Sequence, residues 1–168
     1  MRRSLERSTV TDSLTGLLNR RGWDAEIAKL CQHTDRTGVP FTLAIVDLDH
    51  FKRYNDTFGH LAGDDALRTF AANAEDTLRV VDVIARWGGE EFSIALHGTT
   101  ASEAIGPLER VRASAPEGLS CSVGYIEVGP GADLQQSLSC ADAALYRAKS
   151  GGRDRAVRGS LPRRGQRV

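Results

Sequence analysis

The segment "RWGGEEF" (residues 86–92) places two glycines and two adjacent carboxylates between two segments that read as strands. The flanking segments are "DVIA" (82–85) and "FSIAL" (92–96), and they predict a β-hairpin with Glu90 and Glu91 at its tip. Turn chemistry alone would be satisfied by Asn-Gly. Two neighbouring acids repel each other, so this hairpin tip needs an explanation beyond the turn itself.

Length and composition predict one globular domain. The chain has 168 residues, of which 40% are hydrophobic and 26% charged, with a formal net charge of zero. This overall charge gives no indication of binding to nucleic acid or to a membrane. Residues 153–168 contain six arginines and one acid, so the preceding part of the chain has an excess of five acids. Such an excess suits a site that binds cations, although a solvated acidic surface is the simpler explanation of charge alone.

Three features bear on the compartment. Cys31, Cys121 and Cys140 are odd in number, form no CxxC motif and fall on apolar positions of expected elements, which predicts buried free thiols in a reducing compartment. No apolar run approaches the roughly 20 residues of a membrane span. The start, "MRRSLERS", lacks the apolar segment of a signal peptide. We therefore expect a cytoplasmic protein.

Hydrophobic periodicity predicts helices alternating with strands. The strand at 40–49 is apolar enough to be buried on both sides, and the strand at 119–128 alternates as a half-buried strand does. Two helices are expected from apolar residues at helical spacing: one after the turn-like segment 18–22, with Trp23, Ile27, Leu30 and Cys31, and one after an N-cap at Asp64 or Asp65, with Leu67, Phe70, Ala71, Ala74 and Leu78. A third helix contains Leu108 and Val111 and starts late or kinks at Pro107. A fourth helix is expected over 133–150 and ends at Gly151. This pattern predicts an α/β (α+β) fold with a single sheet covered by helices.

Acidic residues also follow the expected strand at 40–49. In "VDLDHFKRYND" (46–56), Asp47 and Asp49 lie two apart and would project to one side if the strand continued that far. Next to the acidic hairpin they would form a like-charge cluster, which is costly unless a cation neutralises it. Oxygen ligands without nearby cysteine favour Mg²⁺ or Mn²⁺ over zinc, and Mg²⁺ normally shares its coordination with substrate phosphate. Gly88 and Gly89 would let such a ligand approach the backbone.

Each of these signals is weak alone, but together they resemble a family. The relevant segments, in order, are "DSLTGLLNRRGW" (12–23), "VDLDHFKRYNDTFGHLAGDDAL" (46–67), "RVVDVIARWGGEEF" (79–92), "SCSVGYI" (120–126) and "ADAALYRAKSGGRD" (141–154). This combination is similar to the GGDEF-domain diguanylate cyclases over residues 11–156, with 1–10 as the end of a connecting segment and 157–168 as a basic tail expected to be disordered. The resemblance implies a single mixed sheet flanked by helices, like the palm of nucleotide cyclases and polymerases.

The same resemblance implies an activity: condensation of two GTP molecules into cyclic di-GMP with release of two pyrophosphates. Because the product is symmetric and the motifs of each protomer provide one GTP site, we expect a two-fold homodimer. Asp47 resembles the metal-binding aspartate, with the backbone carbonyl of Leu48 contributing. Glu90 resembles the acid that binds metal and serves as base for the 3′-hydroxyl, and Glu91 the adjacent acid that reaches a second metal. Lys52 resembles the lysine that faces the phosphates.

Substrate recognition is assigned in the same way. Asn55 and Asp64 resemble the residues that read guanine, with His60 close by. A carboxylate can accept hydrogen bonds from guanine N1–H and N2–H₂, and an amide can serve O6 or N3. Lys149 and Arg153 resemble the residues that hold the triphosphate.

A separate inhibitory site is implied by "RVVD" (79–82). Arg79 and Asp82 resemble the family's product-binding motif, with Arg110 or Arg112 as the second arginine. Arginine reads guanine through bidentate bonds to O6 and N7. The alternative is an ordinary surface ion pair at a helix end.

The sequence departs from the commonest family pattern at three positions. The signature has Glu90 where many members have aspartate, Trp87 replaces a common Phe or Tyr, and Asp154 replaces a common Asn. Trp87 is expected to pack without consequence. Asp154 lies beside Arg153 and is expected to weaken the positive potential there.

Two other functions remain open. One is a catalytically silent module that binds GTP or cyclic di-GMP, against which the intact Asp47, Lys52, Glu90 and Glu91 argue. The other is a palm-like cyclase or polymerase with a different product, which the guanine-reading pair Asn55 and Asp64 disfavours.

Overall fold

The structure is a computed structural model and describes residues 9–162. Its helices are α2 (Arg20–Thr37), α3 (Phe51–Phe58), α4 (His60–Thr77), α5 (Ala101–Ala113) and α6 (Leu134–Ser150). Its strands are β1 (Phe41–Leu48), β2 (Val83–Gly88), β3 (Glu91–Leu96), β4 (Cys121–Val128) and β5 (Ala156–Arg158). Within this part of the chain, no helix is long and apolar enough to cross a membrane.

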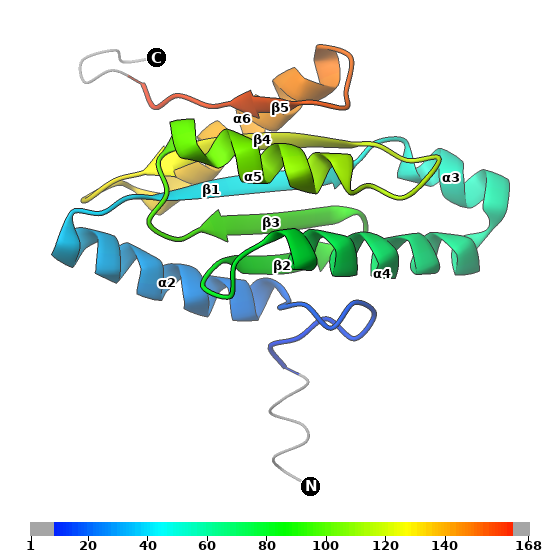
Figure 1. Ribbon diagram of the computed structural model, residues 1–168, viewed down its shortest axis with the longest axis horizontal. Helices are drawn as coiled ribbons and strands as arrows, with labels where there is room; N and C mark the ends of the chain where they lie inside the picture. Colours follow the sequence, from blue (N-terminus) through cyan, green and yellow to red (C-terminus); the bar gives the residue numbers. More distant parts are fainter. Residues whose placement is uncertain (1–8, 163–168) are drawn as a thin grey trace, which may run out of the picture.

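The strands form a single mixed sheet in the order β2-β3-β1-β4-β5 (Figure 1). β1 pairs antiparallel with both β3 and β4, β2 pairs antiparallel with β3, and β4 pairs parallel with β5. The hairpin predicted from "RWGGEEF" is confirmed as β2–β3, with Glu91 already the first residue of β3. The hairpin therefore lies against the central strand, β1.

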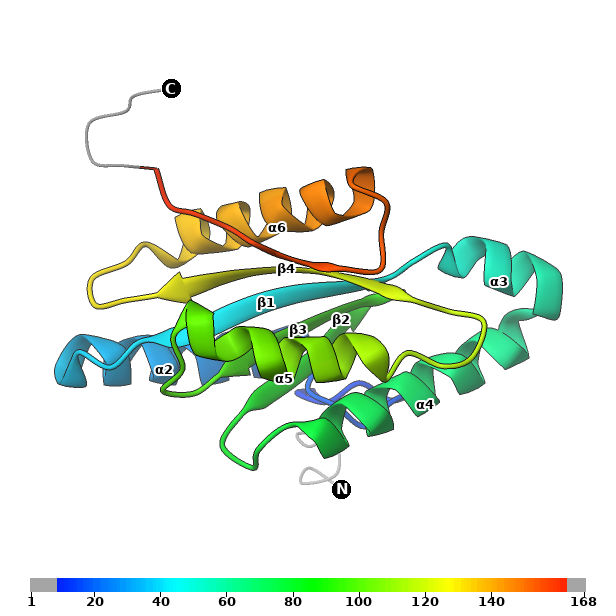
Figure 2. The same cartoon turned by 45° about the horizontal axis from the view of Figure 1, so that its top comes forward.

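Helices cover both faces of the sheet (Figures 1 and 2). On one face, α4 and α5 pack against alternate residues of β1, including Ala44 and Val46. On the other face, α2 and α6 pack against Leu43 and Ile45. Every residue of β1 is buried, which confirms the prediction of a strand enclosed on both sides.

The prediction of a half-buried β4 was wrong. Its residues are buried except for Glu127, which is only partly exposed. Val123 and Tyr125 pack toward α5, while Ile126 and Val128 pack on the opposite side with α2 and α6. The alternation of small and large residues therefore reflects helices on two faces, and no face of β4 is left to solvent.

Helix boundaries differ from the predictions at two places. α2 begins at Arg20, with the Asn19 side chain accepting from the Gly22 N–H, so the turn-like segment 18–22 already contains the helix start. α4 begins at His60, not after Asp64 or Asp65, because the break lies at Gly59, whose φ is +90°. An aspartate is a favoured N-cap, but here the glycine decides the boundary.

The end of β1 also differs from the prediction. The strand ends at Leu48, and α3 follows from Phe51, an element that the sequence did not predict. Asp49 turns toward β4, where its carboxylate accepts hydrogen bonds from Ser120 Oγ and Ser122 Oγ, each at 2.7 Å. Asp49 therefore stabilises the end of β1 through these serines. It does not project beside Asp47 as a continued strand would have placed it.

α5 starts six residues before Pro107, so the expected late start was wrong. Thr100 and Glu103 form a capping box that sets the helix start. The helix continues through Pro107 to Ala113. α6 matches its prediction, with Asp133 as N-cap and Gly151 as C-cap.

Two further expectations need correction. The expected disordered tail began at residue 157, but Val157 and Arg158 belong to β5, and the Gly159 N–H donates to the Tyr125 carbonyl at 2.6 Å. The rest of the proposed tail from 163, and residues 1–8, lie outside the described residues. All three cysteines are free thiols, as expected, but only Cys121 is buried, since Cys31 and Cys140 are partly exposed.

Candidate active site

Asp47 occupies the centre of the candidate site. It is the penultimate residue of β1, lies opposite Glu91 of β3, and is only 5% exposed. Its carboxylate forms an ion pair with the Lys149 ammonium at the end of α6. Burial raises the pKa of Asp47, and the neighbouring charge of Asp49 acts in the same direction, while the hydrogen bond from Lys149 opposes both. A buried carboxylate is thus held beside one cationic side chain.

Glu90 lies in the turn of the β2–β3 hairpin. Gly88 and Gly89 enter this turn with φ of +146° and +53°, conformations that residues with a Cβ rarely adopt. The Glu90 carbonyl accepts from the Leu48 N–H at 3.3 Å, which ties the turn to the end of β1. Burial and then the charge of Asp47 raise the pKa of Glu90. The repulsion anticipated from the sequence is therefore present in the structure.

The acidic cluster is incomplete as a metal site made of side chains alone. Within residues 9–162, no three His, Cys, Asp or Glu side chains are arranged to hold a metal ion. Asp47 and Glu90 nevertheless interact electrostatically, and Glu91 is exposed beside them. Two carboxylates with a nearby backbone carbonyl fit Mg²⁺, which usually takes only one or two protein carboxylates and completes its coordination with water and phosphate.

The hairpin turn is fixed by two residues that the sequence did not single out. Arg86 donates through Nε and Nη2 to the Gly89 carbonyl, at 3.0 and 2.9 Å, and through Nη1 to Asp12. Asp12 also accepts from the N–H and the hydroxyl of Thr15. Asp12 belongs to the segment "DSLTGLLNR", which was noted in the sequence, but it lies 74 residues from Arg86, so no local pattern indicated that the two residues form a pair.

Trp87, expected to be ordinary packing, sits in an aromatic contact beside this turn. Its ring meets Trp23 edge-on with centroids 6.2 Å apart, and the Arg20 guanidinium lies 3.8 Å from its centroid. The contact joins the last part of β2 to the start of α2.

The predicted guanine readers lie on α3 and α4. Asn55 Oδ1 is buried without a hydrogen-bond partner, and it lies against Gly63, where a Cβ would come within 1.7 Å of it. Asp64 follows Gly63 and is partly exposed, while His60, the first residue of α4, is exposed. The structure therefore brings Asn55 close to the turn that carries Asp64, and leaves one buried acceptor unsatisfied.

The predicted phosphate-binding residues lie on separate elements. Lys52 is exposed near the start of α3, and Lys149 and Arg153 lie at and after the end of α6. Asp154 does not stand unopposed beside Arg153, because Arg112 Nη1 donates to its Oδ1 at 2.7 Å. The expected weakening of the positive potential is therefore offset by a second arginine.

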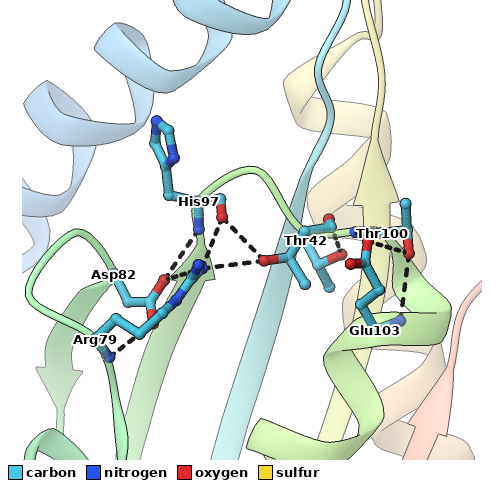
Figure 3. Close-up of polar contacts among 7 residues, drawn as sticks. Thr42, Arg79, Asp82, His97, Thr100 and Glu103 are labelled. Carbon is cyan, nitrogen blue, oxygen red and sulfur yellow. Dashed lines mark hydrogen bonds and ion pairs between the residues drawn. The ribbon is translucent and has the colours of Figure 1, made fainter.

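Arg79 and Asp82 form a closed network at the opposite end of β2 (Figure 3). Asp82 accepts from the Arg79 backbone N–H, from its guanidinium and from the His97 N–H. The guanidinium also donates to the His97 carbonyl at 2.7 Å and to Thr99. The Arg79 side chain is 58% exposed and that of Asp82 only 2%. Of these two residues, Arg79 is therefore the one that a ligand could contact.

The two candidates for the second arginine of the predicted inhibitory site, Arg110 and Arg112, lie in the last turn of α5. Arg79 lies near the start of α5, where the Glu103 charge contributes to raising its pKa after the larger effect of the Asp82 hydrogen bond. Arg110 lies seven residues beyond Glu103 on α5, but its side chain extends back toward the helix start, where a Cβ at Gly106 would lie 3.7 Å from Arg110 Nη1. Arg112 pairs with Glu109 and Asp154.

A concave surface also lies away from the carboxylates. A cavity of about 670 Å³ is bounded by Tyr54 and Phe58 of α3, by α4, and by the loop at 116–118. It does not include Asp47 or Glu90. The raised pKa values of Asp47 and Glu90 and the contact of Asp47 with Lys149 occur at the acidic cluster instead.

A single mixed sheet with helices on both faces, and acids where its central strand meets a hairpin, defines a palm-like domain of the nucleotide-cyclase class. The chain belongs to the GGDEF family. The family described as "Diguanylate cyclase, GGDEF domain" matches residues 9–155.

Similar proteins carry related names. Diguanylate cyclase DgcP of Pseudomonas aeruginosa is 40% identical over 156 residues, covering 87% of this chain and 23% of DgcP. The solved coiled coil and GGDEF domain of DgcB from Caulobacter crescentus, in complex with c-di-GMP, has a TM-score of 0.87 at 32% identity, covering 94% of this chain and 89% of that one. An active GGEEF domain of a diguanylate cyclase from Vibrio cholerae has a TM-score of 0.81 at 29% identity, with 87% and 99% covered. The chain spans less than half the length of the curated relatives it matches.

Proposed function

We propose that this domain condenses two GTP molecules into cyclic di-GMP and two pyrophosphates, with Mg²⁺ or Mn²⁺ as cofactor. The observation that supports this most strongly is the acidic cluster, where Asp47 is buried beside Lys149 and Glu90 has a raised pKa next to Asp47. Carboxylates in that arrangement are costly without a cation. The divalent ion that accompanies a polyphosphate substrate would supply positive charge in addition to that of Lys149.

Each turn of the reaction forms one P–O bond and breaks another. The 3′-hydroxyl of one GTP attacks the α-phosphorus of the other, the bond to the β-phosphate breaks, and pyrophosphate leaves. Glu90 accepts the proton of the hydroxyl, because its raised pKa brings it closer to that of an effective base at neutral pH. Asp47, Glu90 and the Leu48 carbonyl would hold one divalent ion and Glu91 would reach a second, and these ions would neutralise phosphate charge.

Substrate binding is divided among the remaining residues. Asn55 and Asp64 read guanine, with His60 beside them, and the unsatisfied Asn55 Oδ1 is available to a donor of the base. Lys52, Lys149 and Arg153 contact the triphosphate. When substrate and metal bind, Lys149 exchanges its contact with Asp47 for phosphate.

We propose a homodimer as the active form. The product contains two identical halves, and the residues assigned here provide for one GTP in each protomer. A two-fold arrangement would bring both substrates together for the two attacks. Arg79, Asp82 and Arg110 form the inhibitory product site in this proposal.

The test is an incubation of the chain with GTP and Mg²⁺, followed by chromatographic separation of the products. Cyclic di-GMP and pyrophosphate are expected in a 1:2 ratio, as two condensations per product require. Binding of GTP without turnover would instead support the silent binding module. A different cyclic or linear nucleotide would support another palm-like activity. Substitution of EDTA for Mg²⁺ is expected to stop turnover.

A further inference from the structure

The segment that follows α6 has an unusual backbone. Gly152, Arg153 and Asp154 have φ of +117°, +63° and +47°. Glycine adopts this region freely and aspartate tolerates it, but an arginine there is uncommon. Such conformations persist only where surrounding contacts hold them, and they concentrate at functional sites. Arg153 is therefore kept in its conformation by its neighbours.

Three contacts of residues 153 and 154 with other elements hold this turn, in addition to the hydrogen bond from Arg155 Nε to the Arg153 carbonyl at 3.0 Å. The Arg153 N–H donates to the Ala148 carbonyl at 2.9 Å, and the Asp154 N–H donates to Asp49 Oδ2 at 3.0 Å. The third contact is a side-chain ion pair, from Arg112 Nη1 to Asp154 Oδ1 at 2.7 Å, which joins the end of α5 to the turn. The turn is thus tied both to the end of β1 and to α5.

Arg112 is itself held in place. Its Nε and Nη2 lie 2.8 and 2.7 Å from Glu109 Oε2, one turn earlier on α5, and its side chain is only 24% exposed. Because Glu109 orients the guanidinium, Nη1 is directed toward Asp154. This geometry makes Arg112 a fixed partner for Asp154 rather than a mobile surface charge.

The ion pair between Arg112 and Asp154 also limits the attraction between the Asp154 carboxylate and the Arg153 guanidinium. The Asp154 N–H donates to Asp49, two residues after Asp47, and Lys149 at the end of α6 pairs with Asp47, so the turn lies beside the acidic cluster. Without Arg112, the Asp154 carboxylate would be free to attract the adjacent Arg153. The Arg112 contact therefore leaves Arg153 available for an anion.

We propose that Arg112 and Asp154 are positioning residues for the substrate triphosphate. They hold the turn at 152–154. Because Arg112 forms an ion pair with the Asp154 carboxylate, Arg153 is free to contact the phosphates. The inference rests on the proposed function only in assigning substrate phosphate to Arg153. Neither Arg112 nor Asp154 contacts the substrate itself.

The test measures binding rather than turnover. The full 168-residue chain is titrated by calorimetry with a GTP analogue carrying a methylene between the α- and β-phosphates, in Mg²⁺, and separately with guanosine. Arg112→Ala is expected to weaken analogue binding about tenfold, since charge-assisted contacts are the strong ones. Guanosine lacks phosphates, so its affinity is expected to stay the same. Lys29→Ala is the matched control, because Lys29 also makes an i,i+3 ion pair, with Glu26 at 3.2 Å, but on α2.

A second pair of variants separates positioning from simple folding. Asp154→Asn removes the competing charge while keeping a side chain that tolerates the left-handed region, so adding it to Arg112→Ala is expected to restore most of the analogue affinity. In an Arg153→Ala background, Arg112→Ala is expected to change the affinity by less than twofold. Equal weakening of analogue and guanosine, no restoration by Asp154→Asn, or full additivity with Arg153→Ala would overturn the proposal.

The outcome is independent of catalysis. If the chain binds the analogue with these variant effects yet makes no cyclic di-GMP, the positioning role stands and the proposed activity fails. If the parent chain does not bind the analogue, the positioning role fails as well. Should Arg112→Ala not fold by circular dichroism, Arg112→Gln keeps the aliphatic part of the side chain, removes its charge from the Asp154 carboxylate and is expected to show the same selective loss.

Discussion

Arg86 and Asp12 are 74 residues apart and form an ion pair in which Nη1 of Arg86 lies 3.0 and 3.2 Å from the two carboxylate oxygens of Asp12. The same guanidinium donates twice to the Gly89 carbonyl. One side chain therefore joins the N-terminal loop to the turn that precedes Glu90. Both side chains are mostly buried, at 14% and 17% exposure, so the pair is well shielded from solvent.

Arg86→Ala is expected to lower the free energy of unfolding by about 2 kcal/mol, because it leaves the Asp12 carboxylate and the Gly89 carbonyl without their shared donor. The measurement is urea denaturation at pH 7. Arg68→Ala serves as the control, since its pair with Asp65 is exposed and is expected to contribute less than about 0.5 kcal/mol. A loss in Arg86→Ala no larger than in this control would show that the pair does not stabilise the hairpin.

The Asp12 pair also predicts a pH dependence. Burial alone would raise the pKa of Asp12, but the hydrogen bonds from Thr15 and the charge of Arg86 outweigh it and lower the pKa. The stability that Asp12 contributes is therefore fully present above its unfolded pKa of about 4 and is lost as the pH falls through the folded value. The free energy of unfolding of Asp12→Asn is therefore expected to fall less than that of the parent between pH 7 and the acid range, because the variant has no carboxylate to protonate at this position.

Glu90→Gln and Asp47→Asn are each expected to reduce cyclase turnover at least about 100-fold, because each removes a charge from the proposed metal site. Initial rates of cyclic di-GMP formation at saturating GTP and Mg²⁺ give the measurement. Retention of full activity by either variant would remove that residue from the catalytic assignment.

The metal-free stability of Glu90→Gln is expected to increase at pH 7. The pKa of Glu90 is raised by burial and by the Asp47 charge, so ionisation destabilises the fold as the pH rises through the folded pKa. The melting temperature should rise by no more than about 3 °C, because Glu90 is partly exposed and its charge is screened. Below about pH 4 the wild-type carboxylate is protonated, and the difference should disappear. Asp47→Asn should gain less, since Lys149 then loses its partner.

Gly63→Ala is expected to weaken GTP binding without unfolding the protein. A Cβ at this position would lie 1.7 Å from Asn55 Oδ1 and 2.9 Å from its Cγ, so the end of the Asn55 side chain must move. Alanine is otherwise favoured over glycine within a helix by about 1 kcal/mol. Calorimetric titration with GTP and ATP gives the measurement: the parent should prefer GTP at least about tenfold, and the variant should lose much of that preference. Equal affinities of the parent for both nucleotides would refute the guanine pocket.

Arg79→Ala is expected to keep the initial rate of cyclic di-GMP formation but to remove the slowing that accompanies product accumulation. Arg79 is the accessible member of its network, whereas Asp82 is almost fully buried. Loss of its charge-assisted donors should weaken cyclic di-GMP binding more than about tenfold by titration calorimetry. If progress curves and affinity match those of the parent, the motif is only a local ion pair that orders the turn before β2.

The inhibitory-site prediction has a control within the same helix. Arg110 and Arg112 were both possible second arginines, and the structure engages Arg112 with Glu109 and Asp154. Arg110→Ala should therefore weaken product binding, whereas Arg112→Ala should act on GTP binding instead. The reverse pattern would exchange their assignments.

Local sequence patterns were sufficient for much of the fold. The hairpin, the doubly buried β1 and the limits of α6 follow from short-range signals: glycines at a turn, an uninterrupted apolar run, and an aspartate and a glycine as helix caps. The start of α4 was missed because Gly59 and Asp64 are both plausible boundary residues, and only the path of the chain after α3 selects the glycine. β4 was misjudged because its burial depends on helices remote in sequence.

The site divides in the same way. The sequence by itself determined which residue types are available for the chemistry, since Asp47, Glu90 and Lys149 could be named from motifs that resemble one family. The tertiary structure alone decided their partners: Asp47 with Lys149, Arg86 with Asp12, and Arg112 with Asp154, pairs separated by 102, 74 and 42 residues. Electrostatic and hydrogen-bond energies depend on distance in space and on burial, which no local pattern specifies. Those energies are set when the sheet and its two layers of helices bring distant segments together.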